Sequence, residues 1–476
     1  MQFNSIDFAI FLPIVFLLYW FVINKNLKIQ NIFLVVVSYI FYGWWDWRFL
    51  FLIFVSTIVD YFVGMELHKN EEKSKRKFLL WLSIGVNLSL LGFFKYYNFF
   101  LDNFINAYSF LGYKINANSL NIILPVGISF YTFQTMSYTI DVYKRKLKPT
   151  KDFVSFAAFV SFFPQLVAGP IERATRLLPQ FFKQRTFHYE KAVDGFRQIL
   201  WGLFKKIVIA DNCAEYVNTI FGNSDKYSAS TLLLGAFLFS FQIYCDFSGY
   251  SDIAIGTARL FGFELTKNFN FPFFSRSIPE FWRKWHISFL LWMRDYVYYP
   301  LSNIRESRLI KMRNIFIIYI LTGFWHGANW TFIVWGIVTA TFFIPSIFFN
   351  RNRKNTIASK NNIPSLKEFF QMIVTFGLFT LSIIIFRAEN LSHALKYFSG
   401  MVSLSLFSIP QILPKSLILS ILFFIIIEWL GRDQQYAIAK FGIRWNRPLR
   451  YSFYYSLIII ILFFADKEQE FIYFQF

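Results

Sequence analysis

Long apolar segments constrain this chain more than any other feature of its sequence. They run for about twenty residues almost without charged side chains, a length and composition that suit a membrane-crossing helix. Four ranges are such segments or the start of one: Phe8–Ile23, Phe49–Met65, Phe369–Phe386 and Leu417–Ile427. In roughly 30 Å of hydrocarbon, only helices and closed barrels satisfy every backbone hydrogen bond. The sequence therefore predicts an all-α, polytopic transmembrane helical bundle with about ten to twelve spans.

Composition and charge agree with a membrane protein. Charged residues make up 16% of the chain, whereas soluble domains contain about 25%. The formal net charge is +20, from 48 Lys and Arg against 28 Asp and Glu. Basic loops hold the cytoplasmic side of a bilayer, so this excess predicts orientation in a membrane. The sequence has no aromatic–basic RNA-binding signature and no zinc-ligand spacing, and we expect neither a nucleic-acid partner nor a bound metal.

The basic loops predict the topology. We expect five of them on the cytoplasmic face of the membrane: Asn24–Gln30, His68–Lys77, Lys144–Lys151, Asn350–Lys367 and Arg432–Arg450. The spans between and beyond these loops then place both termini outside. The first residues, Met1–Asp7, have no basic n-region and no small-residue cleavage site. Phe8 onward is therefore predicted to be a retained first span rather than a signal peptide.

The middle of the chain, residues 151–313, is predicted to be the least regular part of a single integral membrane domain, residues 1–476. It mixes apolar stretches with internal carboxylates at Asp211, Asp246, Asp252 and Asp295. Charges that face lipid are costly, and non-helical backbone at membrane depth needs protein or water around it. We therefore expect re-entrant helices or a cavity lining in this region.

His326 is the strongest candidate for chemistry among the five histidines. It lies in Asn314–Asn350, thirty-seven residues without Lys, Arg, Asp or Glu. It follows the basic edge Arg308–Arg313 by about a dozen residues, which at 1.5 Å per residue is about 18 Å, roughly half the hydrocarbon depth. Small or polar neighbours (Gly323, Gly327, Ala328, Asn329) would let another molecule approach. His326 could be a core histidine that only hydrogen-bonds to helix backbone. An ionisable ring at this depth is costly, however, so we interpret it as a functional residue.

Two further patterns have two interpretations each. His286 ends the aromatic and basic stretch Phe281–His286, which is either an interfacial anchor or part of a re-entrant site. The segment Tyr244–Asp252 contains Asp246, Ser248 and Asp252 in an apolar context. These carboxylates either line a polar cavity or bind a cation, or they pair with arginines such as Arg259 or Arg294.

The remaining candidates carry little chemistry. His68, His188 and His393 have polar neighbours near expected span ends, and Cys213 and Cys245 are interpreted as packing residues. The sequence lacks a Walker loop, HExxH, a GxSxG elbow and a dinucleotide GxGxxG. ATP hydrolysis by such a loop and zinc-protease chemistry are therefore not expected.

The region around His326 resembles a known family. The run Gly323–Phe332, followed by Trp335 and Gly336, is similar to the signature around the catalytic histidine of bacterial membrane-bound O-acyltransferases, especially the membrane subunits that acetylate alginate or peptidoglycan. Further similar stretches follow the family order over nearly the whole chain: Phe162–Pro170 with Glu172 and Arg173, Tyr244–Gly256, Phe281–Pro300 and Phe471–Phe476.

The resemblance implies a catalytic region at residues 267–350, with His326 as catalytic histidine and His286 as a second, supporting one. It implies a central tunnel in which an acyl group passes from a thioester, most simply acetyl-coenzyme A, to a hydroxyl, with no permanently bound cofactor. Tunnel candidates are Trp325, Asn329, Trp330, Trp282, Arg283, Arg294, Asp295, Asp246, Ser248 and Asp252. The stretch Lys267–Arg313, with nine Lys and Arg against three acids, could bind donor phosphates or anchor the interface.

The resemblance also implies an acceptor outside the cytoplasm, such as peptidoglycan or another cell-wall or exported polysaccharide. Transfer would be direct, or it would pass to a periplasmic or extracellular partner of the SGNH-type acetyltransferase class. A transporter or lipid flippase that uses intramembrane Asp and His residues as a proton relay is the alternative. Inverted repeats would favour that alternative, and the sequence has none.

Overall fold

The computed structural model is built from helices, and the residues it describes contain no β-strand. It describes the chain except residues 116–117, 303–306, 350–362, 466–468, 470 and 473–476. The predicted all-α class is confirmed. Two compact units share the chain: Met1–Ala192 with Thr257–Thr266, and Val193–Gly256 with Lys267–Phe476. The single domain over residues 1–476 stays a prediction.

The helices that lie wholly in the first unit are α1 (Ile6–Leu17), α2 (Leu27–Gly43), α3 (Leu50–Lys69), α4 (Lys73–Leu91), α5 (Tyr97–Phe110), α6 (Ile128–Tyr143), α7 (Phe153–Ser161), α8 (Phe163–Leu166) and α9 (Ala174–Leu177). Side-chain caps begin several of them: Ser5 accepts from Phe8 N at 3.2 Å, and Asn26 accepts from Lys28 N at 2.9 Å. Such caps satisfy backbone N–H groups that a helix leaves without an internal partner.

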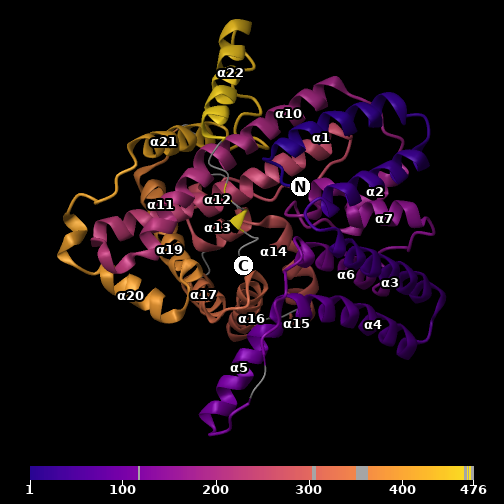
Figure 1. Cartoon of the computed structure of the whole chain (residues 1–476), viewed down its shortest axis with the longest axis horizontal. Coiled ribbons are helices and arrows are strands. Elements are labelled where there is room, and N and C mark those ends of the chain that lie inside the picture. The colour runs from indigo at the N-terminus through magenta and orange to yellow at the C-terminus, as the bar shows by residue number, and fades with distance from the viewer. Residues whose placement is uncertain (116–117, 303–306, 350–362, 466–468, 470, 473–476) are drawn as a thin grey trace. The chain divides into compact units, whose positions relative to one another are not determined.

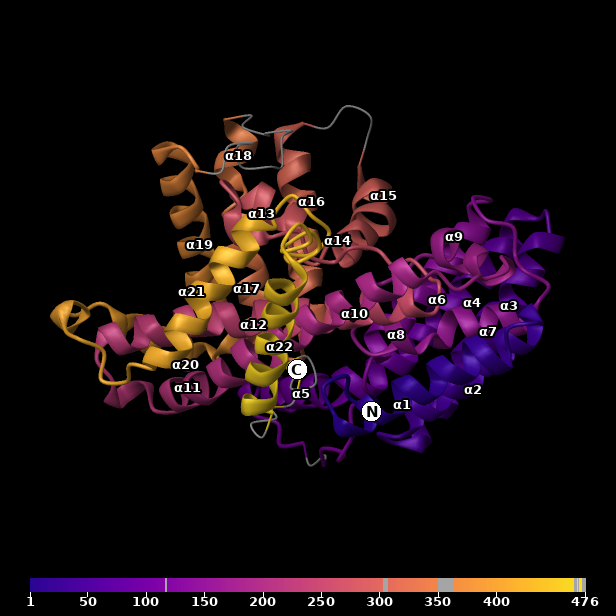
Figure 2. The same ribbon diagram turned by 90° about the horizontal axis from the view of Figure 1, so that it is seen from above.

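A buried polar cluster joins three helices of the first unit. Asp60 on α3 is fully buried and accepts hydrogen bonds from Asn87 on α4 at 2.9 Å and from Thr139 on α6 at 3.0 Å. Ser83 on α4 donates to the same carboxylate. Helices α3, α4 and α6 lie side by side in both views (Figures 1 and 2). The cluster satisfies a carboxylate that would otherwise be costly to bury.

Helices α10 (Tyr189–Leu203) and α12 (Ala229–Leu260) contribute residues to both units. Those wholly in the second unit are α11 (Asp211–Gly222), α13 (Ile278–Lys284), α14 (Ile287–Met293), α15 (Tyr299–Leu301), α16 (Arg308–His326), α17 (Trp330–Thr341), α18 (Ile344–Phe348), α19 (Leu366–Arg387), α20 (Leu391–Met401), α21 (Lys415–Leu430) and α22 (Arg447–Phe464). Helices α16, α17 and α19 stand side by side in Figure 2. This group of helices holds the candidate catalytic histidine.

Six helices of the described chain are long and apolar enough to cross a membrane: Trp47–Lys69, Lys73–Phe110, Ala229–Leu260, Trp330–Phe348, Leu366–Arg387 and Arg447–Phe464. Ile6–Val22 and Leu27–Gly43 are apolar but shorter. Other apolar stretches are interrupted, as at the break between α13 and α14. The chain is a multi-pass membrane protein, whereas ten to twelve crossings and the orientation of both termini stay predictions.

The middle region, residues 151–313, combines short helices with one long helix. Helix α12 runs without interruption for 32 residues. The predicted re-entrant character of this region stays a prediction. The carboxylates of α12 do not interrupt the helix, because they face the protein interior rather than lipid. Asp246, for example, is 2% exposed. The predicted basic loop Asn350–Lys367 lies mostly outside the described residues.

Candidate active site

A tight turn between α16 and α17 positions the region around His326. Helix α16 ends at His326, and α17 begins four residues later at Trp330. Asn329 caps α17 by accepting from Thr331 N at 3.0 Å, while its Nδ2 donates to the Glu389 carbonyl at 2.9 Å. Asn329, a predicted tunnel residue, therefore has a structural role at the helix start.

Glycines allow α16 and α17 to pack closely. A Cβ atom on Gly323 would overlap the carbonyl oxygen of Phe332, and one on Gly336 would overlap that of Tyr319. Small residues at a helix crossing bring two backbones together in a membrane. The close crossing fixes the end of α16, and with it the position of the His326 side chain.

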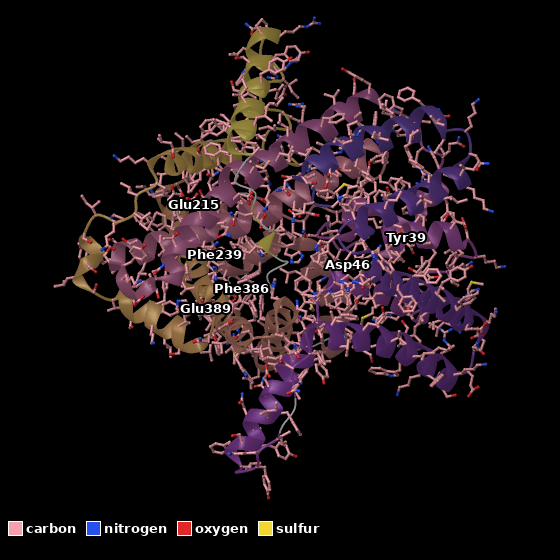
Figure 3. The ribbon with its side chains drawn as sticks, in the orientation of Figure 1. Tyr39, Asp46, Glu215, Phe239, Phe386 and Glu389 are labelled. Atoms are coloured by element: carbon pink, nitrogen blue, oxygen red, sulfur yellow. The ribbon has the colours of Figure 1, made fainter. Side chains whose placement is uncertain are left out.

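The imidazole of His326 lies among aromatic rings and is 6% exposed. Its centroid is 4.9 Å from the ring of Trp325, 5.5 Å from that of Trp335 on α17 and 5.1 Å from that of Phe386 on α19. Phe386 and Glu389, which follows the end of α19, are labelled in Figure 3. The structure therefore confines the ring from three helices, α16, α17 and α19.

Three buried polar groups on α17, the helix that brings Trp335 next to this ring, are left without hydrogen-bond partners. Among the described residues, Nε1 of Trp335 and the hydroxyls of Thr331 and Thr339 make no hydrogen bond. All three side chains are on α17, and each residue is at most 3% exposed. Buried donors are nearly always satisfied in proteins, so their presence here fits a site that receives a polar ligand.

His286 lies at the junction of α13 and α14 in a left-handed backbone conformation, with φ 44° and ψ 51°. That conformation is unfavourable for a residue with a Cβ atom and often marks a functional position. The break is held by Asn268, whose carbonyl accepts from Ile287 N at 2.8 Å and whose Oδ1 accepts from Ser288 Oγ at 2.9 Å. The predicted re-entrant stretch is thus two short helices with His286 between them.

Aromatic rings connect the two histidines. The Phe289 ring stacks on His286, with centroids 4.9 Å apart and planes 19° apart, and its centroid is 6.5 Å from that of His326. Trp325 stacks on Phe289 at 4.4 Å and lies 5.7 Å from His286. Both predicted catalytic histidines and Trp325 are therefore in one cluster, with Phe289 between the imidazoles.

Among the other predicted tunnel residues on these helices, Trp282 joins this cluster. Its ring lies 5.8 Å from Trp335, and it is 6% exposed. Trp330 is 51% exposed, and Arg283 is also exposed. Arg294 donates to the neighbouring Asp295 at 2.7 Å, with the Arg294 side chain 47% exposed. Arg283 and Arg294 are therefore accessible cations.

Asp246 on α12 belongs to a buried ionic cluster. Lys206 lies 2.9 Å from its carboxylate and 2.8 Å from that of Asp211, and all three side chains are at most 3% exposed. The second oxygen of Asp246 accepts from Ile472 N at 2.7 Å, while Lys206 also donates to the Gln469 carbonyl at 2.9 Å. This cluster attaches the backbone of Gln469 to Lys206 and that of Ile472 to α12.

Asp252 has a lysine partner as well. Lys205 lies 2.5 Å from its carboxylate, and Gln198 donates to it at 2.7 Å. Ser248 lines a small pocket of about 20 Å³ with Lys205 and Asp252. Pairing with arginines such as Arg259 or Arg294 was one of the alternatives that the sequence left open. In the structure, adjacent lysines of the π-helical segment Phe204–Ala210 pair with the α12 carboxylates.

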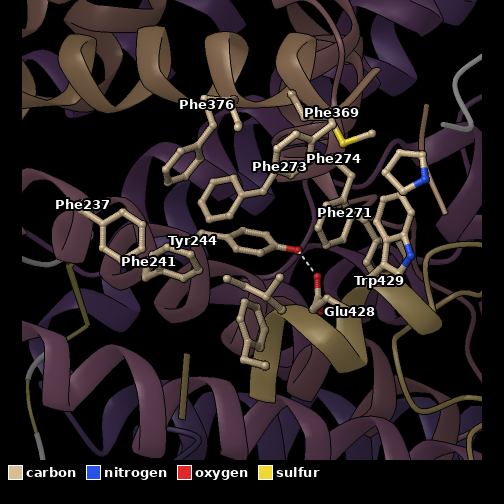
Figure 4. Close-up of a pocket in the computed structure, with 15 residues that line it drawn as sticks. Phe237, Phe241, Tyr244, Phe271, Phe273, Phe274, Phe369, Phe376, Glu428 and Trp429 are labelled. Atoms are coloured by element: carbon tan, nitrogen blue, oxygen red, sulfur yellow. Dashed lines mark hydrogen bonds between the residues drawn. The ribbon is translucent and has the colours of Figure 1, made fainter. Parts of the chain in front are cut away.

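Figure 4 shows a larger cavity of about 390 Å³ among α12, α19 and α21. Aromatic rings line it, including Phe237, Phe241 and Phe376. At its edge the Tyr244 hydroxyl donates to Glu428 at 2.7 Å. Neither candidate histidine lines this cavity, so its size alone does not make it the reaction site.

Several residues of the second unit were missed by sequence reasoning. Lys205, Lys206 and Glu428 bind buried groups, and Phe247 packs on His286 at 4.6 Å. Phe289 separates the imidazoles. The two internal lysines in the apolar run after Leu203 were an available signal, because buried lysines need carboxylate partners. Among the described residues, no three His, Cys, Asp or Glu side chains form a possible metal site.

Comparison with known proteins identifies the family of this chain. Residues 32–386 match the sequence profile of MBOAT, the membrane-bound O-acyltransferase family. The chain belongs to this family. Its identification from the His326 run is confirmed, and the matched region contains both candidate histidines.

The names of relatives of this chain refer to peptidoglycan, alginate or teichoic acid. A peptidoglycan O-acetyltransferase of Helicobacter pylori is 36% identical over 425 residues, 83% of this chain and 78% of that protein. A probable alginate O-acetylase AlgI of Azotobacter vinelandii is 37% identical over 91% of this chain and 85% of its own length. A teichoic acid D-alanyltransferase of Bacillus subtilis is 28% identical over 57% of this chain and 71% of its own. The chain is an O-acyltransferase.

Proposed function

We propose that this membrane-bound O-acyltransferase moves an acetyl group from a cytoplasmic thioester, acetyl-coenzyme A, to hydroxyls of an extracytoplasmic polysaccharide or peptidoglycan. The names of the two relatives that cover most of the chain support an acetyl group and such an acceptor. The observation that carries the proposal is the buried His326 imidazole beside the ring of Trp335, whose Nε1 has no hydrogen-bond partner among the described residues.

In this proposal His326 acts as general base and then as general acid. The imidazole takes the proton of the acceptor hydroxyl as the oxygen attacks the thioester carbonyl carbon. The carbon–sulfur bond then breaks, and the imidazolium returns the proton to the leaving thiolate, so that ester and free thiol result. Positioned proton transfer of this kind contributes about 10²–10⁴ in rate.

Trp335 supplies a second element of the reaction. Its Nε1–H is buried beside the imidazole and has no partner among the described residues. A fixed donor directed at the reacting carbonyl stabilises the negative charge that develops on its oxygen. Confinement by Trp325, Trp335 and Phe386 keeps the His326 ring oriented.

His286 is assigned a positioning role. Its imidazole stacks on Phe289, which in turn stacks on Trp325, next to His326. The strained backbone at His286 directs its ring into this stack between α13 and α14. His286 therefore supports the geometry of His326 through the stacked rings of Phe289 and Trp325.

The remaining parts of the proposal concern orientation and partners. The predicted basic loops support a cytoplasmic donor side and outside termini in the bacterial inner membrane. The exposed Arg283 and Arg294 support donor-phosphate binding at that side. Some acceptors cannot reach the buried imidazole. For these, a periplasmic or extracellular partner of the SGNH-type acetyltransferase class receives the acetyl group and transfers it to the acceptor hydroxyl.

Purified protein reconstituted in vesicles tests the proposal. Acetyl-coenzyme A and peptidoglycan fragments are supplied on opposite sides, and free thiol and acetylated glycan are measured. We expect both products in wild-type vesicles and neither in His326→Ala vesicles. Translocation of intact lipid or glycan without thiol release would instead support the transporter alternative.

A further inference from the structure

The first unit contains a basic cavity that the proposed reaction does not use. It measures about 500 Å³ and is lined by Trp20, by residues 176–192 and by residues 259–264. Its cationic or basic side chains are Arg176, Lys183, Arg185, His188, Lys191 and Arg259. Glu264 is the one carboxylate among its lining residues, and it lies 3.7 Å from Lys191. The cavity therefore has a large excess of positive charge.

Arg185 makes this cavity a built site rather than a charged surface. Its side chain is buried, with the residue 7% exposed. Nη2 donates to Asn31 at 2.7 Å and to Gln30 at 3.1 Å, and both acceptors are neutral amides. Nε and Nη1 are buried and have no hydrogen-bond partner among the described residues. No carboxylate of the described chain forms an ion pair with Arg185.

Aromatic rings fix the orientation of this guanidinium. It lies 5.7 Å from the centroid of Tyr19 and 4.9 Å from that of Phe263. Tyr19 is itself held by a hydrogen bond to the Phe261 carbonyl at 3.2 Å. A rigid, buried cation with free N–H groups is costly unless an anion balances it. Guanidinium groups match phosphate oxygens in charge and geometry.

The rim of the cavity indicates the source of the anion. Phe182 is 47% exposed and Phe187 is 44% exposed, beside Lys183. Exposed aromatic rings next to basic side chains are typical of the headgroup level of a membrane. Gln30, which contacts Arg185, belongs to the predicted cytoplasmic loop Asn24–Gln30. These neighbours favour a lipid of the cytoplasmic leaflet over a soluble anion.

We propose that this cavity binds a phosphate group, and that its source is the headgroup of an anionic membrane lipid. The phosphate accepts from Nε and Nη1 of Arg185 at the bottom of the cavity, and Lys183 and Arg176 add charge nearer its opening. The fatty-acyl chains remain in the bilayer beside the exposed phenylalanines.

The test uses the full-length protein in detergent and measures its melting temperature with added lipid. Phosphatidylglycerol should raise the wild-type melting temperature more than phosphatidylcholine does. Arg185→Gln and Lys183→Gln should each weaken this response, with apparent lipid affinity reduced about tenfold for Arg185→Gln. Lys148→Gln is the control, since it removes an equally exposed lysine of the first unit outside the cavity.

Inorganic pyrophosphate separates the two phosphate sources. If it raises the wild-type melting temperature, loses this effect in both cavity variants and competes with phosphatidylglycerol, the site takes soluble phosphates as well. If it has no effect while the lipid response depends on Arg185 and Lys183, the lipid source is supported. An equal response of wild type and Lys183→Gln to both probes would overturn the proposal, even if Arg185→Gln failed to fold.

Discussion

Trp335 packs edge-on against His326, with ring centroids 5.5 Å apart and planes 84° apart. The two rings come from opposite sides of the α16–α17 crossing, where Gly323 and Gly336 let the helices approach. The tryptophan Nε1 has no hydrogen-bond partner among the described residues. An indole N–H group and an imidazole are thus carried by two neighbouring rings.

Removal of that donor should slow transfer without unfolding the protein. Trp335→Phe keeps an aromatic ring of similar shape but removes Nε1–H, and we expect a fall in kcat of about 10²-fold or more. The measurement is the rate of thiol release by reconstituted protein at saturating donor. Trp81→Phe, a swap at a 60% exposed position on α4, should keep the wild-type rate. Equal rates for both variants would exclude a role for the Trp335 N–H.

The left-handed backbone of His286 allows a test that separates strain from ring stacking. Glycine adopts this conformation freely, whereas alanine keeps the strain and loses the ring. We expect His286→Gly to be more stable than His286→Ala by about 1 kcal/mol, and both to lose activity because the stack on Phe289 is gone. Thermal unfolding and kcat are measured on the same preparations. Full activity of His286→Gly would show that the imidazole is dispensable.

The buried cluster of Lys206 should contribute strongly to stability. Lys206→Met leaves the carboxylates of Asp211 and Asp246 buried without their cation, which typically costs about 3–5 kcal/mol. Lys69→Met breaks an exposed pair with Glu66, which water screens, and should leave the stability close to that of the wild type. Denaturant unfolding in detergent compares the two variants. Similar losses would mean that water reaches the Lys206 cluster.

The glycine crossing predicts a matched pair of alanine variants. A Cβ at Gly336 would overlap the Tyr319 carbonyl oxygen, so Gly336→Ala must push α16 away from α17. Overpacking of this kind typically costs about 1–3 kcal/mol and should also reduce activity, because His326 ends α16. Gly377→Ala on α19 meets no atom within 4 Å and should be neutral. Melting temperatures that do not differ between the two variants would contradict this packing.

Much of this account could be predicted from the sequence, for identifiable physical reasons. Apolar segments of membrane-spanning length gave the all-α class, because the bilayer permits few alternatives. His326 stood out because an ionisable ring in thirty-seven residues without charge has a high cost unless it is used. These inferences depend on local composition, and local composition is fully visible in a sequence.

Tertiary partners could not be predicted in the same way. The lysines that neutralise Asp246 and Asp252 are forty and forty-seven residues away along the chain, at Lys206 and Lys205. Adjacent lysines on a π-helical segment can each reach a different α12 carboxylate only because of how these elements pack. The stack through Phe289 likewise depends on the break at His286, which the aromatic and basic pattern of that stretch did not locate.

The most direct test of the central claim is acyl transfer by His326→Ala, measured as glycan acetyl content in cells with matched membrane levels of each protein. We expect a fall of about 10²–10⁴, whereas His68→Ala, at an exposed position, should match wild type. Folding is verified by the melting temperature, since one imidazole among packed rings should be removable without unfolding. Wild-type acetylation by a folded His326→Ala protein would contradict the assignment of His326 as the catalytic base.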